Sequence, residues 1–156
     1  MSITFIKQDL TTSDAQYICH QVNCQGVMGS GIAKQVREKY PNVFEMYKKR
    51  CDEAVACRRS PLGIVLFCHI GNNKHIANLF AQDKFGYDGS CYTDYKALKD
   101  CLETVRGNAS KNDIIAIPYL MGCHRGGGSW DIVYSMIEEV FGDSESEVLI
   151  CEYNGG

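Results

Sequence analysis

Glycine is concentrated at two points of this chain, and each point lies between a strand-like run and a helix-like run. The first cluster has glycine at positions 26, 29 and 31, and the second at positions 122, 126, 127 and 128. The runs before them, residues 17–22 and 114–117, are short and apolar. After each cluster, apolar residues recur at helical spacing, from Ile32 and from Trp130. This order is typical of α/β layer folds, which bind ligands beyond the carboxyl ends of their strands.

The rest of the chain continues the alternation of strands and helices. Further strands are expected over residues 3–6, 62–70, 75–81 and 148–151, with a hairpin turn at 71–73. Helices are expected over 32–40, 43–51, 95–107 and 130–141, the last three capped by Asn42, Thr93 and Ser129. We therefore predict one domain over residues 1–156, a three-layer α/β/α fold with a mixed central sheet flanked by helices.

Composition excludes several classes of protein and partner. The chain is 45% hydrophobic and carries a net charge of −3, which argues against holding nucleic acid through a basic surface. No export leader and no window of about eighteen apolar residues is present, so neither export nor membrane spanning is expected. Nine cysteines without a C-x-x-C pair predict reduced thiols in a cytoplasmic protein and no structural zinc.

The two glycine loops predict a site for a phosphate group. Glycine permits close approach of a ligand to the backbone and the angles that an amide nest needs. The first loop lacks the P-loop lysine, since Ile32 stands there, and Lys34 occupies the third glycine position of a dinucleotide fingerprint. A nucleoside triphosphatase and a dinucleotide-dependent dehydrogenase are thus not expected. The alternative is that both loops are ordinary turns.

Four segments in order resemble the macrodomain family, and together they extend over nearly the whole chain. They are ITFIKQDL at 3–10, HQVNCQGVMGSGIA at 20–33, IPYLMGC at 117–123 and WDIVYSMIEEVF at 130–141. The resemblance is greatest to the branch of terminal ADP-ribose protein glycohydrolases, DNA-ADP-ribose-removing antitoxins and ADP-ribose 1″-phosphate phosphatases. It implies ADP-ribose or an ADP-ribosylated macromolecule as partner, with no cofactor and no metal, and we expect a monomer.

The resemblance also implies roles for individual residues. Asp9, helped by the Leu10 amide, would bind the adenine amino group, and Asn23 the distal ribose hydroxyls. Tyr153 and Asn154 would flank the adenine. The diphosphate and distal ribose would be held by the two loops, that is by Gly29, Ser30, Gly31, Ile32, Gly122, Cys123, His124, Arg125, Gly126, Gly127 and Gly128. On the residues alone, the alternative for Asp9 is a loop or capping carboxylate, and that for Asn23 is a turn amide.

The family pattern breaks where the glycohydrolases of this branch place their catalytic groups. Their lysine position falls on Gln82 and their acid falls among the glycines 126–128, while Lys84 lies two residues farther on. Gln82 cannot form a Schiff base. The phosphatases carry a histidine where this chain has His20, which suggests a water attack helped by His20 and positioned by Asn23 and Gln82.

Three functional hypotheses therefore stay open. The first is hydrolysis of an ester, glycosidic or 1″-phosphate linkage at the distal ribose, with His20 as acid or base and His124 as a second candidate. The second is a non-catalytic ADP-ribose reader, since the lysine and the acid are missing. The third, a thiol nucleophile at Cys24 or Cys123, is not favoured by any spacing.

Overall fold

A six-stranded mixed sheet forms the centre of the molecule. The computed structural model describes residues 2–153, and within them the strand order is β1-β6-β5-β2-β4-β3. Only the β3–β4 pair is antiparallel among these neighbours. The strands are β1 (Ser2–Lys7), β2 (Tyr17–Asn23), β3 (Val65–Gly71), β4 (Lys74–Gln82), β5 (Ile114–Pro118) and β6 (Glu147–Glu152). The predicted mixed sheet and the predicted hairpin are confirmed.

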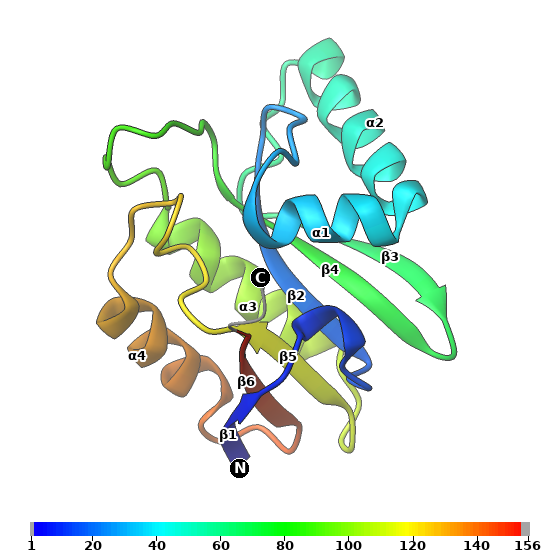
Figure 1. Ribbon diagram of the computed structural model, residues 1–156, viewed down its shortest axis with the longest axis vertical. Helices are drawn as coiled ribbons and strands as arrows, with labels where there is room; N and C mark the ends of the chain where they lie inside the picture. The colour runs from blue at the N-terminus through cyan, green and yellow to red at the C-terminus, as the bar shows by residue number, and fades with distance from the viewer. Residues whose placement is uncertain (1, 154–156) are drawn as a thin grey trace.

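Helices cover both faces of the sheet, as the fold class predicted (Figure 1). They are α1 (Gly31–Lys39), α2 (Pro41–Cys57), α3 (Tyr95–Asn108) and α4 (Trp130–Phe141), with a 3₁₀ helix η1 (Leu10–Thr12) after β1. The larger part of the core lies between the sheet and the α3 and α4 layer, and smaller clusters lie under α1 and α2. Side chains alternate between these two layers along each strand.

Two of the expected helix caps are wrong. Asn42 lies inside α2, which begins at Pro41 because proline is well suited to the first helical position. Thr93 is not the cap of α3: Asp94 is, and its Oδ1 accepts from the Ala97 N–H at 2.9 Å. Thr93 instead donates its hydroxyl to the carbonyl of Gly122 at 2.7 Å. Sequence alone does not decide between adjacent cap residues when one is used by a loop.

The topology brings three loops to one end of the sheet. Strand β2 runs parallel to both β4 and β5, so the segments that follow these strands all leave at the same edge. In Figure 1 these are the blue, green and yellow-to-orange loops that gather beyond the strand ends. No helix among residues 2–153 is long and apolar enough to span a membrane.

Candidate functional site

A cavity of about 330 Å³ lies where the three loops meet. Its wall is made by the end of β2 and the loop into α1, by the start of the β4–α3 loop, and by the loop between β5 and α4. Predicted residues in the wall are His20, Asn23, Gly29, Ser30, Gly31, Ile32, Gln82, Gly122, His124, Arg125 and Gly126. The structure thus brings the two glycine loops together around one space, as expected for a ligand site at the strand ends.

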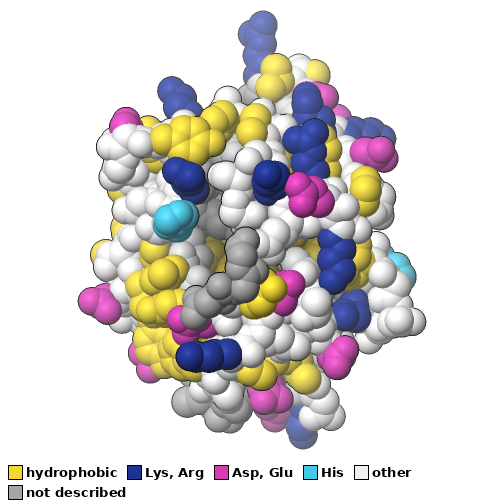
Figure 2. Space-filling view, in the orientation of Figure 1, with side chains coloured by type: hydrophobic (Ala, Val, Ile, Leu, Met, Phe, Trp, Pro, Cys, Tyr) yellow, Lys and Arg dark blue, Asp and Glu magenta, His cyan; other side chains and the backbone are white. Residues whose placement is uncertain are grey.

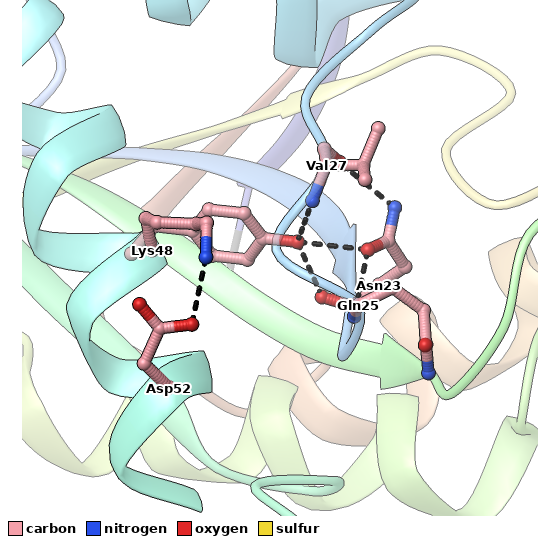
Figure 3. A network of polar contacts seen from close by, with 6 residues as sticks. Asn23, Gln25, Val27, Lys48 and Asp52 are labelled. Atoms are coloured by element: carbon pink, nitrogen blue, oxygen red, sulfur yellow. Dashed lines mark hydrogen bonds and ion pairs between the residues drawn. The ribbon is translucent and has the colours of Figure 1, made fainter. Parts of the chain in front are cut away.

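The first loop is held in shape by the Asn23 carboxamide. Its Nδ2 donates to the Val27 carbonyl at 2.9 Å, and its Oδ1 accepts from the Gln25 N–H and the Tyr47 hydroxyl (Figure 3). The Tyr47 hydroxyl also accepts from the Val27 N–H. Asn23 therefore uses both ends of its amide within the loop, and a ribose contact would have to replace one of these bonds.

Helix α1 presents an uncapped N-terminus to the cavity. Ser30 occupies the N-cap position, but its side chain makes no capping hydrogen bond. Gly31, Ile32 and Ala33, the first three residues of the helix, all line the cavity. The N–H groups of a first turn have no partner inside the helix and carry the positive end of its dipole. This end of the cavity is suited to a phosphate or another anion.

The loop after β5 is tied to the loop after β4. The carbonyl of Gly126 accepts from the N–H groups of Tyr92 and Thr93, at 2.6 and 3.0 Å. A Cβ at Gly127 would meet the Ser90 carbonyl, and one at Gly126 would meet the Thr93 hydroxyl. The packing of one loop on the other therefore requires glycine at both positions. The sequence analysis had attributed these two glycines to close approach of a ligand. Two loops thus form a single wall.

Aromatic side chains and one arginine stand at the mouth of this cavity. Phe85 is 41% exposed and Tyr87 is 67% exposed, although both line the cavity. The guanidinium carbon of Arg125 lies 4.5 Å from the centroid of the Tyr87 ring, which is a cation–π contact. The contact joins the β4–α3 loop to the second glycine loop at the rim.

The cavity wall carries positive charge and no negative charge. Within residues 2–153, no Asp or Glu lines it, and Arg125 is its only permanently charged side chain. The rest of the surface is mixed, with Lys and Arg scattered among Asp and Glu on the face shown in Figure 2. The wall therefore suits an anionic ligand and lacks a carboxylate for acid–base work.

His20 is buried beside the first loop. It is 1% exposed, and its Nε2 lies 2.6 Å from Oδ1 of Asn78 on the neighbouring strand. Burial lowers the pKa of His20 to about 4, although the hydrogen bond to Asn78 acts in the opposite direction. The imidazole is therefore neutral at pH 7.

Gln82 has both ends of its amide occupied. Its Oε1 accepts from Gln21 Nε2 at 2.8 Å, and its Nε2 donates to the carbonyl of Lys84 at 3.0 Å. The Lys84 side chain is exposed and does not line the cavity. Neither residue supplies an amine to the cavity wall, in agreement with the doubt that the sequence raised about a lysine mechanism.

Several predicted ligand contacts lie away from the cavity wall. Asp9 caps η1, its Oδ1 accepting from the N–H and the hydroxyl of Thr11, at 2.9 and 2.8 Å. Leu10 is buried behind it. Cys123, Gly127 and Gly128 belong to the second loop but do not line the cavity, and neither does the exposed Tyr153. Asn154 lies outside the described residues.

The thiols next to the site are poor nucleophiles. Burial raises the pKa of Cys24 to about 11 and that of Cys123 to about 11. Only the thiolate is strongly nucleophilic, and little thiolate forms near pH 7 at such values. The geometry gives no support to a cysteine mechanism.

Sequence reasoning missed part of the wall. Gln21, Phe85, Tyr87 and Tyr119 line the cavity and were not predicted. The signal for Phe85 and Tyr87 was present, since both stand in a polar, glycine-containing loop of residues 83–92. Exposed aromatic residues in such loops commonly serve binding.

Comparison with known proteins gives related sequences and folds. The DNA ADP-ribosyl glycohydrolase of Mycobacterium tuberculosis is 28% identical over 139 residues, which cover 89% of this chain but 38% of that protein. An ADP-ribose 1″-phosphate phosphatase of Neosartorya fischeri is 40% identical over 58 residues, covering 36% of this chain and 29% of that protein. The chain thus spans well under half the length of these relatives. No protein-family model matches it.

Among solved structures, the chain is similar to the macrodomain of Mycobacterium tuberculosis DarG. The TM-score is 0.78 and the identity 25%, with 99% of this chain and 98% of that chain covered. The similarity extends over nearly the whole length of both chains.

Proposed function

The chain has the macrodomain fold, and we propose on that premise that it binds ADP-ribose or an ADP-ribosyl group in the cavity between its glycine loops. Its homologues are named DNA ADP-ribosyl glycohydrolase and ADP-ribose 1″-phosphate phosphatase. The diphosphate would lie against the first turn of α1, and the second loop with Arg125 would close over it. Asp9 and Tyr153 would meet the adenine beyond the cavity.

One observation carries this proposal: the uncapped N-terminus of α1 opens into a cavity that no Asp or Glu of residues 2–153 lines. Unpaired N–H groups bind a diphosphate without a lysine, because the ligand supplies the acceptors that the helix end lacks. A chain with a net charge of −3 is thereby compatible with an anionic ligand.

A pair of matched variants tests the anion site. Ser30→Asp should cap α1 with a carboxylate, stabilising the helix by about 1 kcal/mol while its charge repels the diphosphate. We expect calorimetry to show at least a tenfold loss of ADP-ribose affinity together with an unchanged or higher Tm.

Ser129→Asp is the control for this experiment. Ser129 is the N-cap of α4, also without a side-chain cap bond, and it does not line the cavity. This variant should keep the ADP-ribose affinity. No binding by the folded wild type, or equal affinity in all three proteins, would refute the proposal.

Hydrolysis at the distal ribose is the second candidate function. It is supported by the names of the homologues and by His20 in the cavity wall, where we propose that a neutral His20 assists an attacking water near Asn23 and Gln82. A non-catalytic reader is favoured by the occupied amide of Gln82 and by a wall to which the described residues contribute no Asp or Glu.

Turnover assays distinguish the two candidates. ADP-ribosyl protein, ADP-ribosyl DNA and ADP-ribose 1″-phosphate are each incubated with the wild type and with His20→Gln. Turnover that His20→Gln abolishes supports the hydrolase. If the protein binds ADP-ribose but turns over none of the three substrates, the non-catalytic ADP-ribose reader is supported.

We also propose that the chain acts as a monomer in a reducing, cytoplasmic setting and does not hold nucleic acid through a basic surface. All nine cysteines lie in the described range and are free thiols, and the net charge is −3. Light scattering of the protein as it elutes from a size-exclusion column measures its molar mass and tests whether it is a monomer. A DNA affinity that falls steeply with salt would contradict the last point.

A further inference from the structure

Two buried polar side chains on neighbouring strands, His20 and Asn78, meet beside the cavity that His20 lines. His20 on β2 is paired in register with Asn78 on β4, and Asn78 is paired with Leu66 on β3. Asn78 is completely buried, and His20 is 1% exposed. Such groups are costly to bury unless their hydrogen bonds are made, so the orientation of each one is fixed by its partners.

The partners of Asn78 determine which way its amide points. Its Nδ2 lies 2.9 Å from the Leu66 carbonyl and 3.5 Å from the Cys68 sulfur. A carbonyl oxygen only accepts, so the NH₂ group must face Leu66 and the amide oxygen must face His20. His20 Nε2, at 2.6 Å from that oxygen, must therefore carry the proton.

The other ring nitrogen of His20 is then an acceptor. Nδ1 is buried and has no hydrogen-bond partner within residues 2–153, yet His20 belongs to the wall of the cavity. An unpaired buried acceptor is destabilising until a donor reaches it. The sugar of the proposed ligand carries hydroxyl groups, which are donors of the required kind.

We infer that Asn78 is a positioning residue that holds His20 as the Nε2–H tautomer, so that Nδ1 accepts a hydrogen bond from a hydroxyl group of the bound ligand. The ligand part of this inference rests on the proposed ADP-ribose binding, and the tautomer part does not. In this arrangement the neutral His20 ring acts toward the ligand as a hydrogen-bond acceptor, because the single N–H of the ring is donated to Asn78.

The nitrogen resonances of His20 test both parts. Long-range ¹H–¹⁵N spectra of protein labelled with ¹⁵N-histidine identify which ring nitrogen carries the proton. The signals that are missing from the spectrum of His20→Gln are assigned to His20. We expect His20 in the wild type to be protonated at Nε2. ADP-ribose at saturation should shift Nδ1 in the direction of a hydrogen-bonded acceptor and leave Nε2 nearly unchanged.

Two substitutions at Asn78 separate positioning from packing. Asn78→Asp keeps an oxygen opposite Nε2, so the proton on Nε2 should be retained, while the second oxygen satisfies the Leu66 carbonyl only as a protonated O–H. Asn78→Leu is of similar size and offers no acceptor; it should give a mixture of tautomers and at least a tenfold weaker ADP-ribose affinity. Ile76→Val, buried on the same face of β4, is the control. It should lower Tm without moving the His20 resonances.

The outcomes distinguish this inference from the proposed function. An Nδ1–H tautomer in the wild type overturns the inference, and so does an Nδ1 resonance that ADP-ribose leaves unmoved although calorimetry shows binding. If the wild type does not bind ADP-ribose, the proposed function and the ligand part fail, while the spectra of the free protein still decide the tautomer. Should Asn78→Leu not fold, a proton retained on Nε2 in Asn78→Asp supports the positioning role, and an Nδ1–H tautomer in that variant overturns it.

Discussion

Some residues predicted to contact the ligand have a role in the fold. Asp9 is the clearest case, since it caps η1 just after β1, at the position where the resemblance places an adenine contact. The sequence allowed both interpretations. The structure shows the cap, with Oδ1 bound to Thr11, and leaves the adenine contact as a prediction.

Asp9→Ser separates these two roles. Serine is also a good N-cap, so the stability should change by less than about 0.5 kcal/mol, but the shorter hydroxyl does not reach a base as a carboxylate does. We expect ADP-ribose affinity to fall about tenfold, the value of a hydrogen bond to a charged group. Calorimetry and thermal unfolding measure the two effects.

Asp14→Ser is the control for Asp9→Ser, because Asp14 is exposed and outside the cavity. If Asp9→Ser and Asp14→Ser bind ADP-ribose as tightly as the wild type, Asp9 acts only as a cap.

At the scale of elements, the order of strands and helices could be read from the sequence, because the strand runs are short and apolar and the helices amphipathic. The two glycine loops were correctly placed at strand-to-helix junctions. What the sequence did not contain was the relation between loops distant along the chain. Thr93 looks like a helix cap until Gly122 is seen to accept its hydroxyl proton, and Gly127 looks like a ligand contact until Ser90 is seen beside it.

Thr93→Val tests the tie between the two loops. Valine has the shape of threonine without its hydroxyl, so one N–H of the Gln21 amide loses its acceptor. The carbonyl of Gly122 loses one of its two donors and keeps the N–H of Gly128. Leaving the partly buried amide N–H unpaired costs about 1–3 kcal/mol. We expect a lower free energy of unfolding in urea and weaker ADP-ribose binding.

Thr93→Ser keeps the hydroxyl and should behave nearly as the wild type in both measurements. A Thr93→Val protein with the wild-type affinity and stability would show that the loop is positioned by its backbone bonds to Gly126 alone.

At the scale of the whole molecule, buried His20 links folding to pH. Its pKa is about 4 in the folded protein, against an ordinary value of 6.5. Well above pH 6.5 the ring is neutral in both the folded and the unfolded protein, so it contributes nothing to the change of stability with pH. As the pH falls from 6.5 to 4, the unfolded chain takes up a proton that the folded protein does not, so stability is lost.

We expect His20 to account for roughly 3 kcal/mol of the stability lost between pH 7 and pH 4. Urea unfolding of the wild type and of His20→Gln at both pH values measures this share. The loss should be smaller in His20→Gln by that amount, since the carboxylates titrate alike in both proteins. Equal losses would mean that His20 is not buried as a neutral ring.

The bonds from Gly126 to Tyr92 and Thr93, and the seating of Gly127 on Ser90, have a consequence for how such a site changes over generations. An insertion or deletion in either loop removes the surface on which the other one rests. We therefore expect changes of length in the two loops to be inherited together. Transfer of one loop into a related protein would require the other loop to be transferred with it.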